Sequence, residues 1–210
     1  MQYTANTFID FDGTLINENS SQMLIEHLFA RASTKKQRGL VWLMSSRISW
    51  IITKPLGVAA RLSGEKDTQL WLVLMFFRKE LYVAGNEITS TVARSLHLNP
   101  RLNNEYHQPF IILSVGLEAI IDQFLLLHPE LNCANAYGSK IDLSGQSWWP
   151  RLKNINHKLH YLSNANRPRY FTDYWHEADV FRASLGEAYR IFKLPPSVNT
   201  TDLYLLEESS

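Results

Sequence analysis

Two aspartates near the start of the chain, Asp10 and Asp12, are separated by a single residue and could act together as a pair of carboxylates. They follow apolar residues, and residues i and i+2 of an extended chain point to the same face of a sheet. Gly13 allows a tight turn or a close approach to a ligand, and Thr14 can cap a helix or orient a carboxylate. Paired carboxylates can hold a divalent cation while one acts as nucleophile and the other shuttles a proton. The alternative is a turn without chemistry, because Asp-Gly is common in turns.

The elements that would position these residues are predicted from the apolar pattern. Residues 16–100 form a mainly helical insertion behind a first strand. The strands are expected over residues 3–10, 110–114, 131–137 and 169–173. The helices are expected over residues 16–32, 69–82, 87–98, 117–127 and 151–162, with polar breaks at 35–39 and 63–67 and a helix with a loose acidic tail over 182–210.

The Trp- and Leu-rich stretch over residues 40–62 has two interpretations. One is a helical cap that packs its own core. The other is a helix on a membrane surface, with its basic residues at the lipid headgroups. Both stay open, and a peripheral membrane or lipid contact would involve residues 40–77.

Ser114 stands at the predicted end of a strand and before a helical pattern. A hydroxyl beside the backbone N–H groups at a helix start is a good seat for a phosphate oxygen. Ser114 could equally be a helix N-cap. The candidate substrate-binding residues are Gly13, Thr14, Ser114 and Gly116.

Taken in order, these motifs resemble those of the haloacid dehalogenase (HAD) superfamily. The stretch from Asp10 to Leu15 matches the first motif, D-x-D-G-T-[LIV], and Ser114 matches the second, a strand that ends in Ser or Thr. A helical insertion between these two motifs is typical of the branch with a small helical cap, which includes phosphoserine phosphatase.

The third motif of the family is a lysine that neutralises the phosphate. The local pattern around Lys158 resembles the family's, whereas Lys153 has the more usual distance to the fourth motif. The pattern favours Lys158, and both lysines remain candidates.

The fourth motif, usually Gly-Asp followed by a second acid, is matched by Asp173 and by Glu177 four residues later. Thr172 replaces the usual Gly, Glu177 replaces the usual Asp, and Asp179 is a rival second acid. The alternative is a loop with an acidic helix start, which the helix dipole favours. The resemblance implies four metal-site residues: Asp10, Asp12, Asp173 and Glu177.

The resemblance implies an α/β fold, with a Rossmann-like three-layer core around a parallel sheet and an inserted, mainly helical cap. The core would comprise residues 1–15 and 105–210, and the cap residues 16–104. It also implies a hydrolase, a Mg²⁺-dependent phosphatase that acts on a small phosphorylated metabolite or lipid phosphate through an aspartyl-phosphate intermediate.

The same resemblance implies a role for each catalytic candidate. Asp10 would attack phosphorus, and Asp12 would act as general acid and then general base. Mg²⁺ would be bound by the Asp10 carboxylate, the Asp12 backbone carbonyl and the Asp173 carboxylate. Ser114 and the lysine would bind the phosphoryl group. Asp12 favours a phosphatase, because dehalogenase members lack the second acid of the first motif.

Composition excludes several other classes. The 210 residues are 45% apolar and 20% charged, as in ordinary globular proteins, and the formal net charge of +1 gives no electrostatic case for nucleic acid. A single cysteine excludes an intramolecular disulfide, and neither a signal peptide nor a transmembrane run is visible. A cytoplasmic protein is expected, with a membrane-peripheral one as the alternative. The alternative function is a catalytically weak HAD-fold module that binds a partner or a membrane through its aromatic cap.

Overall fold

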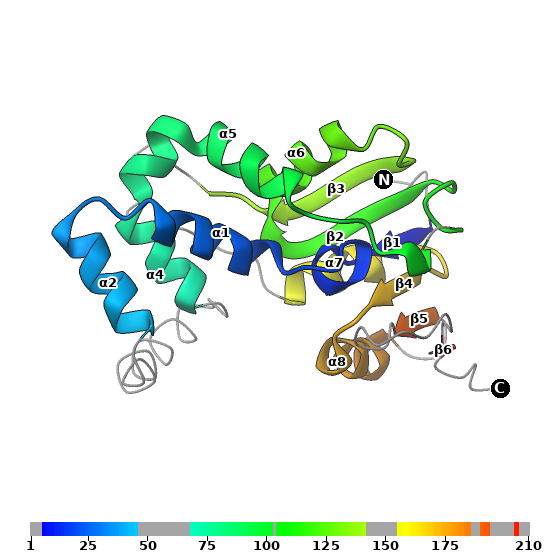
Figure 1. The fold of residues 1–210 in the computed structure, drawn as a ribbon. Coiled ribbons are helices and arrows are strands. Elements are labelled where there is room, and N and C mark those ends of the chain that lie inside the picture. Colours follow the sequence, from blue (N-terminus) through cyan, green and yellow to red (C-terminus); the bar gives the residue numbers. More distant parts are fainter. Residues whose placement is uncertain are drawn as a thin grey trace.

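The fold is built around one six-stranded sheet, with strand order β3-β2-β1-β4-β5-β6 (Figure 1). The computed structural model describes residues 6–45, 68–102, 104–141, 155–185, 190–193 and 204–205. The strands are β1 (Thr7–Ile9), β2 (Phe110–Leu117), β3 (Cys133–Ser139), β4 (Arg169–Thr172), β5 (Arg190–Lys193) and β6 (Tyr204–Leu205). The first five are parallel, and β6 pairs antiparallel with β5. The predicted α/β class with a parallel sheet is confirmed.

Both faces of the sheet are buried, because side chains alternate between the faces along each strand. On β2, Phe110 and Ile112 belong to one apolar cluster, and Ile111 and Leu113 belong to another. The first face is covered by α6 (Glu118–Leu127), and we call it the α6 face; α7 (Ile155–Ser163) and α8 (Trp175–Leu185) cover the second, the α7 face. Two helical layers around a sheet make the expected three-layer core.

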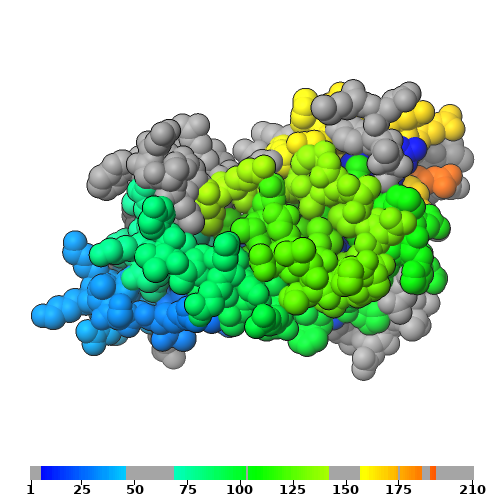
Figure 2. Space-filling model, turned by 90° about the horizontal axis from the view of Figure 1, so that it is seen from above, coloured from blue at the N-terminus to red at the C-terminus, as the bar shows by residue number. Residues whose placement is uncertain are grey.

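Four helices of the described residues lie between β1 and β2 in the sequence. They are α1 (Ser20–Ala30), α2 (Lys35–Ser45), α4 (Thr68–Phe76) and α5 (Arg78–Arg94). They extend the molecule at the end away from β5 and β6, and α2 lies at the tip (Figures 1 and 2). The chain leaves and returns at neighbouring points, since Ile16 and Leu98 form an antiparallel bridge. The proposed boundaries of cap and core stay a prediction.

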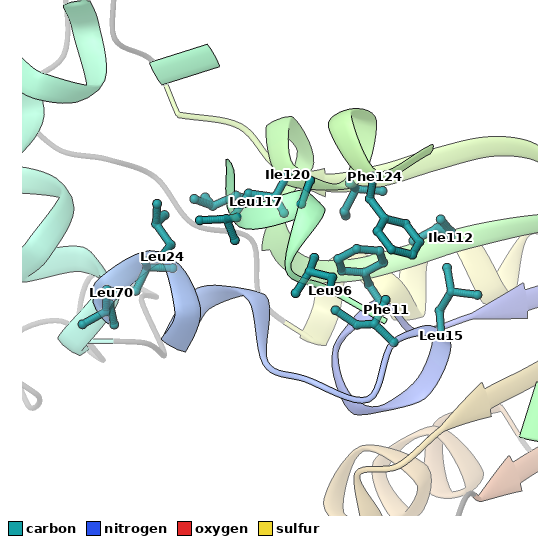
Figure 3. Close-up of a cluster of buried hydrophobic side chains, with 14 of the residues drawn as sticks. Phe11, Leu15, Leu24, Leu70, Leu96, Ile112, Leu117, Ile120 and Phe124 are labelled. Carbon is teal, nitrogen blue, oxygen red and sulfur yellow. The ribbon is translucent and has the colours of Figure 1, made fainter. Parts of the chain in front are cut away.

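The inserted helices do not have a separate core within the described residues. Their buried side chains, such as Leu24 and Leu70, join one continuous cluster with the α6 face (Figure 3). Within it, the rings of Phe11 and Phe124 meet edge to face, with centroids 5.4 Å apart. The buried faces of the described inserted helices therefore continue onto the sheet layer. The expectation of a cap with its own core concerned residues 40–62, of which 46–62 lie outside the described residues, and it stays a prediction.

The expected polar break at residues 35–39 is wrong, because α2 begins at Lys35. The Thr34 hydroxyl accepts a hydrogen bond from Gln37 N, and Gln37 Oε1 accepts from the backbone N–H groups of Ser33 and Thr34. This reciprocal arrangement is a capping box, which starts a helix among polar residues. The second expected break, 63–67, and most of 40–62 lie outside the described residues.

Three further boundaries differ from the predictions. The helix expected over 69–82 is divided at Phe77 into α4 and α5. Helix α5 continues into the helix expected over 87–98 and ends there at Arg94. Strand β2 continues past Ser114 to Leu117. In the C-terminal part, β5 and β6 were not expected, because they are too short for a periodic signal. Pairing with β4 positions β5, and β6 pairs with β5.

No helix in the described ranges has the length and apolar character needed to span a bilayer.

Candidate active site

The first motif lies at the carboxyl edge of the sheet, directly after β1. From β1 the chain continues to β2 and β3 on one side, and later to β4 and β5 on the other. The strand order therefore reverses beside β1, and ligands of open α/β sheets bind at such a switch point. Asp10 N donates to Phe171 O at 2.9 Å, which continues the pairing of β1 with β4 up to this edge.

A single wide turn follows Asp10. Leu15 N donates to Asp10 O and Ile16 N to Phe11 O, each at 3.1 Å, and Gly13 has a φ of 69°. The left-handed conformation favours glycine at this position. Phe11 and Leu15 are buried and anchor the turn in the core, while Phe11 N donates to Asp10 Oδ1 at 2.7 Å. The turn thus fixes one carboxylate oxygen of Asp10.

Asp173, which follows β4, docks on this turn. A Cβ atom on Gly13 would lie 2.2 Å from Asp173 Oδ2, so only glycine leaves room for the carboxylate. Asp173 N donates to Thr14 Oγ1 at 2.9 Å, and that hydroxyl donates to Asp173 Oδ1 at 3.3 Å. Asn99 Nδ2 donates to Thr14 O at 2.9 Å and so ties the returning chain to the same turn. Gly13 and Thr14 therefore position Asp173.

A buried lysine lies beside Asp10. Lys158 on α7 is 1% exposed, and its Nζ is 2.7 Å from Asp10 Oδ2 and 2.9 Å from Glu177 Oε1. Tyr170 and Thr172 donate from their hydroxyls to Glu177 Oε2, at 2.7 and 3.0 Å. We call Asp10, Lys158, Tyr170, Thr172 and Glu177 the lysine cluster.

The lysine cluster follows from the alternation of the strands. Tyr170 belongs to the apolar cluster of the α7 face, as does Phe8, two residues before Asp10. Thr172 lies two residues after Tyr170 on β4, so its side chain points to the same face of the sheet. Helices α7 and α8 cover this face and bring in Lys158 and Glu177.

The lysine cluster places two carboxyl groups around one cation. Burial and, to a smaller extent, the neighbouring Glu177 raise the pKa of Asp10 to about 8, although Lys158 opposes this shift. Burial alone would lower the pKa of Lys158, but Asp10 and Glu177 raise it above its ordinary value. Burial also raises the pKa values of Asp12 and Asp173. Lys158 therefore stays charged, and its one positive charge faces the carboxyl groups of both Asp10 and Glu177.

A second group of polar side chains gathers around Gly116. Ser20 N donates to Asp12 Oδ1 at 2.6 Å, and Gly116 N donates to Ser114 Oγ at 2.9 Å. A Cβ atom on Gly116 would lie 2.8 Å from Asp12 Oδ2 and 3.1 Å from Ser114 Oγ. We call Asp12, Ser20, Ser114 and Gly116 the Gly116 cluster.

The prediction that Ser114 ends a strand immediately before a helix is wrong. Ser114 lies inside β2, at an irregular register between Leu113 and Leu117, and α6 begins only at Glu118. The extra residues let Ser114 and Gly116 approach Asp12. Ser114 thus comes near the first motif through a strand irregularity instead of a helix N-terminus.

The two candidates for the second acid of the fourth motif, Glu177 and Asp179, lie in different environments. Glu177 is 3% exposed in the lysine cluster, whereas Asp179 is exposed on α8. Lys153 lies outside the described residues. Among the described residues, no three His, Cys, Asp or Glu side chains are gathered closely enough to hold one metal ion as they stand.

The sequence did not predict Ser20 or Tyr170 as site residues. It also did not predict that the Thr172 hydroxyl donates to Glu177. The alternation of β4 was a usable signal for Tyr170 and Thr172, because it places both on the side of Asp10. Ser20 had no comparable signal, since its contact with Asp12 depends on how α1 leaves the turn.

Comparisons with known proteins give a likeness of fold. No protein-family model and no curated protein matches the chain. The fold is similar to that of a HAD family hydrolase from Salmonella enterica subsp. enterica serovar Typhi, with 16% identity and a TM-score of 0.47 over 80% of this chain. This chain spans 57% of the length of that hydrolase.

A second similar structure is a phosphoserine phosphatase, solved as an analogue of its phospho-aspartyl intermediate. It has 12% identity and a TM-score of 0.43, over 88% of this chain and 90% of that one. At such identities the two likenesses concern the fold alone, and one fold can host many functions.

Proposed function

We propose that this protein is a Mg²⁺-dependent phosphatase that hydrolyses a phosphoric monoester through an aspartyl-phosphate on Asp10. The observation that carries the proposal is the 2.7 Å contact between Asp10 Oδ2 and Lys158 Nζ at the carboxyl edge of the sheet. A nucleophilic carboxylate and a buried cation beside it are what phosphoryl transfer requires. The substrate would be a small phosphorylated metabolite or a lipid phosphate.

The proposed reaction has two steps. Asp10 attacks phosphorus, its new bond to phosphorus forms as the bond to the leaving oxygen breaks, and Asp12 gives that oxygen a proton. Water then attacks the aspartyl-phosphate, Asp12 takes a proton from it, and inorganic phosphate and free Asp10 remain. Lys158 neutralises phosphoryl charge throughout, and Ser114 binds the phosphoryl group. Positioning and charge neutralisation supply most of the acceleration in such chemistry.

The residues present fit a Mg²⁺ ion by their donor chemistry. Asp10, the backbone carbonyl of Asp12 and Asp173 would bind it, and all three supply oxygen, the donor that Mg²⁺ prefers. Burial raises the pKa values of these carboxyl groups, which is expected of acids that lack enough positive charge nearby. When bound, the ion would supply positive charge to the phosphoryl oxygens.

Glu177, also a predicted metal residue, is better explained as a partner of Lys158. Its Oε1 is 2.9 Å from Lys158 Nζ, and its Oε2 accepts from Tyr170 and Thr172. We assign it to holding the lysine toward Asp10.

The test compares Asp10→Asn with the parent in hydrolysis of 4-nitrophenyl phosphate, with Mg²⁺ and with a chelator. The loss of the nucleophile should lower turnover by at least about 1,000-fold while the unfolding midpoint stays near the parent's. Asp179→Asn is the matched control, because Asp179 is exposed and should keep full activity. Radiolabelled substrate, quenched in acid, should label the parent and not Asp10→Asn. An Asp10→Asn variant as active as the parent would contradict the proposal.

A second candidate function, binding to a membrane surface, is favoured by one observation on α2. Trp42 is 69% exposed, and Lys35 and Arg38 lie on the same side of the helix at spacings of three and four residues. Helix α2 contains no acidic residue. A basic and aromatic face of this kind suits an anionic lipid surface.

Co-sedimentation with vesicles tests this candidate. The parent should bind vesicles with 30% anionic lipid and not neutral ones, and Trp42→Ser should weaken binding. Tyr82→Ser is the control, because Tyr82 is equally exposed but lies on α5. Strong phosphatase activity without vesicle binding would remove the candidate.

A further inference from the structure

A cavity of about 720 Å³ lies between α5, the start of α6 and the end of β3 (Figure 1). Sites for small molecules usually have volumes of about 300–1,000 Å³. None of the residues that line the cavity belongs to the lysine cluster or the Gly116 cluster. Helix α5 is part of the insertion, whereas α6 and β3 belong to the sheet and its helical layer. The cavity is therefore separate from the candidate active site, and a ligand in it would contact both parts of the chain.

Helix α5 bends where it lines the cavity. Ala84 has a φ of −128° and a ψ of 20°, outside the helical range, and the lining includes its neighbours Val83 and Gly85. Thr89 Oγ1 donates to Gly85 O at 2.9 Å, a contact that often bends helices. This wall of the cavity is therefore hydrogen-bonded helix, and its shape is present before a ligand arrives.

Apolar side chains supply part of the cavity surface. Tyr82 and Val83 are 70% and 79% exposed, although both are large and apolar, and the neighbouring Leu81 is buried. Leu117 and Ile141 line the cavity from the sheet side. Adjacent large apolar side chains left exposed at a cavity are surface that a ligand can cover.

The charges around the cavity are unbalanced. The described lining residues include three carboxylates, Glu87, Glu118 and Asp122, and one cation, Lys140. Lys140 pairs with Glu118 and Arg31 pairs with Glu87, each at 3.0 Å, whereas Asp122 forms no ion pair with a described residue. Burial and the neighbouring Glu118 raise the pKa of Asp122, although Lys140 opposes this shift. An incoming positive charge is therefore stabilised most beside Asp122.

We propose that this cavity binds a small organic cation, an ammonium group carried on an aromatic or aliphatic body. The ammonium donates hydrogen bonds to the Asp122 carboxylate, and the body covers the apolar surface of Tyr82 and Val83. The unpaired carboxylate selects for a cation, because a neutral molecule gains only the apolar contact and an anion meets like charge. The inference does not depend on the proposed phosphatase activity.

The test is isothermal titration of the full chain with 2-phenylethylamine, 2-phenylethanol and 3-phenylpropionate. The three probes share a phenylethyl body and differ in charge. We expect saturable binding of the amine with a Kd below about 10 mM, as for other ligands of this size. The alcohol and the acid should bind at least about fivefold more weakly, because an ion pair near the surface contributes modestly.

Two variants locate the bound amine. Asp122→Asn should weaken amine binding by about fivefold and leave alcohol binding unchanged. Ala119→Trp should abolish amine binding, because Ala119 is exposed on α6 and lines the cavity, which an indole ring would fill. The matched controls are Asp179→Asn and Ala183→Trp, both at exposed positions of α8, and they should bind the amine as the parent does.

Three results would overturn the inference. The absence of saturable amine binding up to about 50 mM would show that the cavity does not hold such a cation. Equal binding of the three probes, or an unchanged amine affinity in Asp122→Asn, would show that charge does not select the ligand. Amine binding that survives in a folded Ala119→Trp would lie elsewhere on the protein. Each of these results leaves the proposed phosphatase intact, because its own test is the turnover of Asp10→Asn.

Discussion

The two sides of the candidate site differ in how their polar groups are satisfied. On the α7 face, the lysine cluster is closed, because Lys158 and Glu177 contact each other and their neighbours at 2.7 to 3.1 Å. On the other side, the Gly116 cluster is open, because the Asp12 carboxylate accepts from Ser20 but forms no ion pair with a cation among the described residues, and burial raises its pKa. In the proposed reaction, the closed side would hold its charges in place before substrate arrives, and the open side would leave Asp12 able to give and take a proton.

Substitutions on the two sides should therefore affect stability and activity differently. Disruption of the closed cluster leaves buried charges without partners, so it should lower both stability and activity. Disruption of the open cluster should lower activity with little effect on stability.

Lys158→Met should produce the largest change. It removes the cation between two buried carboxylates, and breaking a buried ion pair costs about 3–5 kcal/mol of the free energy of unfolding. Urea denaturation measures the loss, and turnover should vanish. Lys140→Met is the control, because the exposed Lys140 pairs with Glu118 at 3.0 Å on the surface and its loss should barely move the midpoint. Equal midpoints for the two variants would contradict the closed cluster.

A comparison of Lys153→Met with Lys158→Met tests which of the two lysines binds the phosphate. Lys153→Met should keep most of the activity if Lys158 has the phosphate-binding role. Loss of turnover in Lys153→Met, with an active Lys158→Met, would reverse the assignment.

Glu177→Gln should have an intermediate effect. It keeps the shape but loses the charge that pairs with Lys158 and accepts from Tyr170 and Thr172, so unfolding should become easier by about 2 kcal/mol. Thermal and urea unfolding check the value against the exposed Asp179→Asn, which should behave as the parent. A fully stable Glu177→Gln would mean that its charge contributes nothing to the cluster.

Gly116→Ala tests the open cluster. Its new Cβ would lie 2.8 Å from Asp12 Oδ2, so the carboxylate must move, and a small misplacement of a catalytic group can cost about 100-fold in rate. Stability should change less than in Glu177→Gln. Gly39→Ala is the control, because nothing lies within 4 Å of its new Cβ, and alanine inside α2 should stabilise by about 0.5–1 kcal/mol. Parent-like kinetics of Gly116→Ala would place Asp12 outside the reaction.

Tyr170→Phe should have the smallest effect. It deletes the hydroxyl that lies 2.7 Å from Glu177 and 3.1 Å from Lys158, and one hydrogen bond contributes about 1 kcal/mol. Because Lys158 keeps both carboxylates, turnover should stay within about threefold of the parent. A steady-state assay with a parallel melting curve checks both values, and a collapse of activity would show that Tyr170 takes part in the reaction.

Local signals explain why much of the fold and several site residues could be predicted. The pattern from Asp10 to Thr14 stands in five adjacent residues, and the buried strands are short apolar runs that neighbouring residues determine. Asp173 could be predicted for the same reason, since it directly follows the apolar strand β4. The prediction of a polar break at residues 35–39 was wrong, because the capping box that starts α2 consists of polar side chains. Apolar spacing does not reveal such a start.

Adjacent residues were enough to identify the chemical groups of the first motif and the strand ends at which Asp10 and Asp173 stand, because motif spacing and strand periodicity are local properties. The partners of these residues follow from the packing of distant segments. Lys158 meets Asp10 across 148 positions of the chain, and Ser114 approaches Asp12 through an irregular strand. The contact of Ser20 with Asp12 likewise depends on how α1 leaves the turn. Such contacts depend on how helices and strands pack, and packing arises between segments that no local pattern connects.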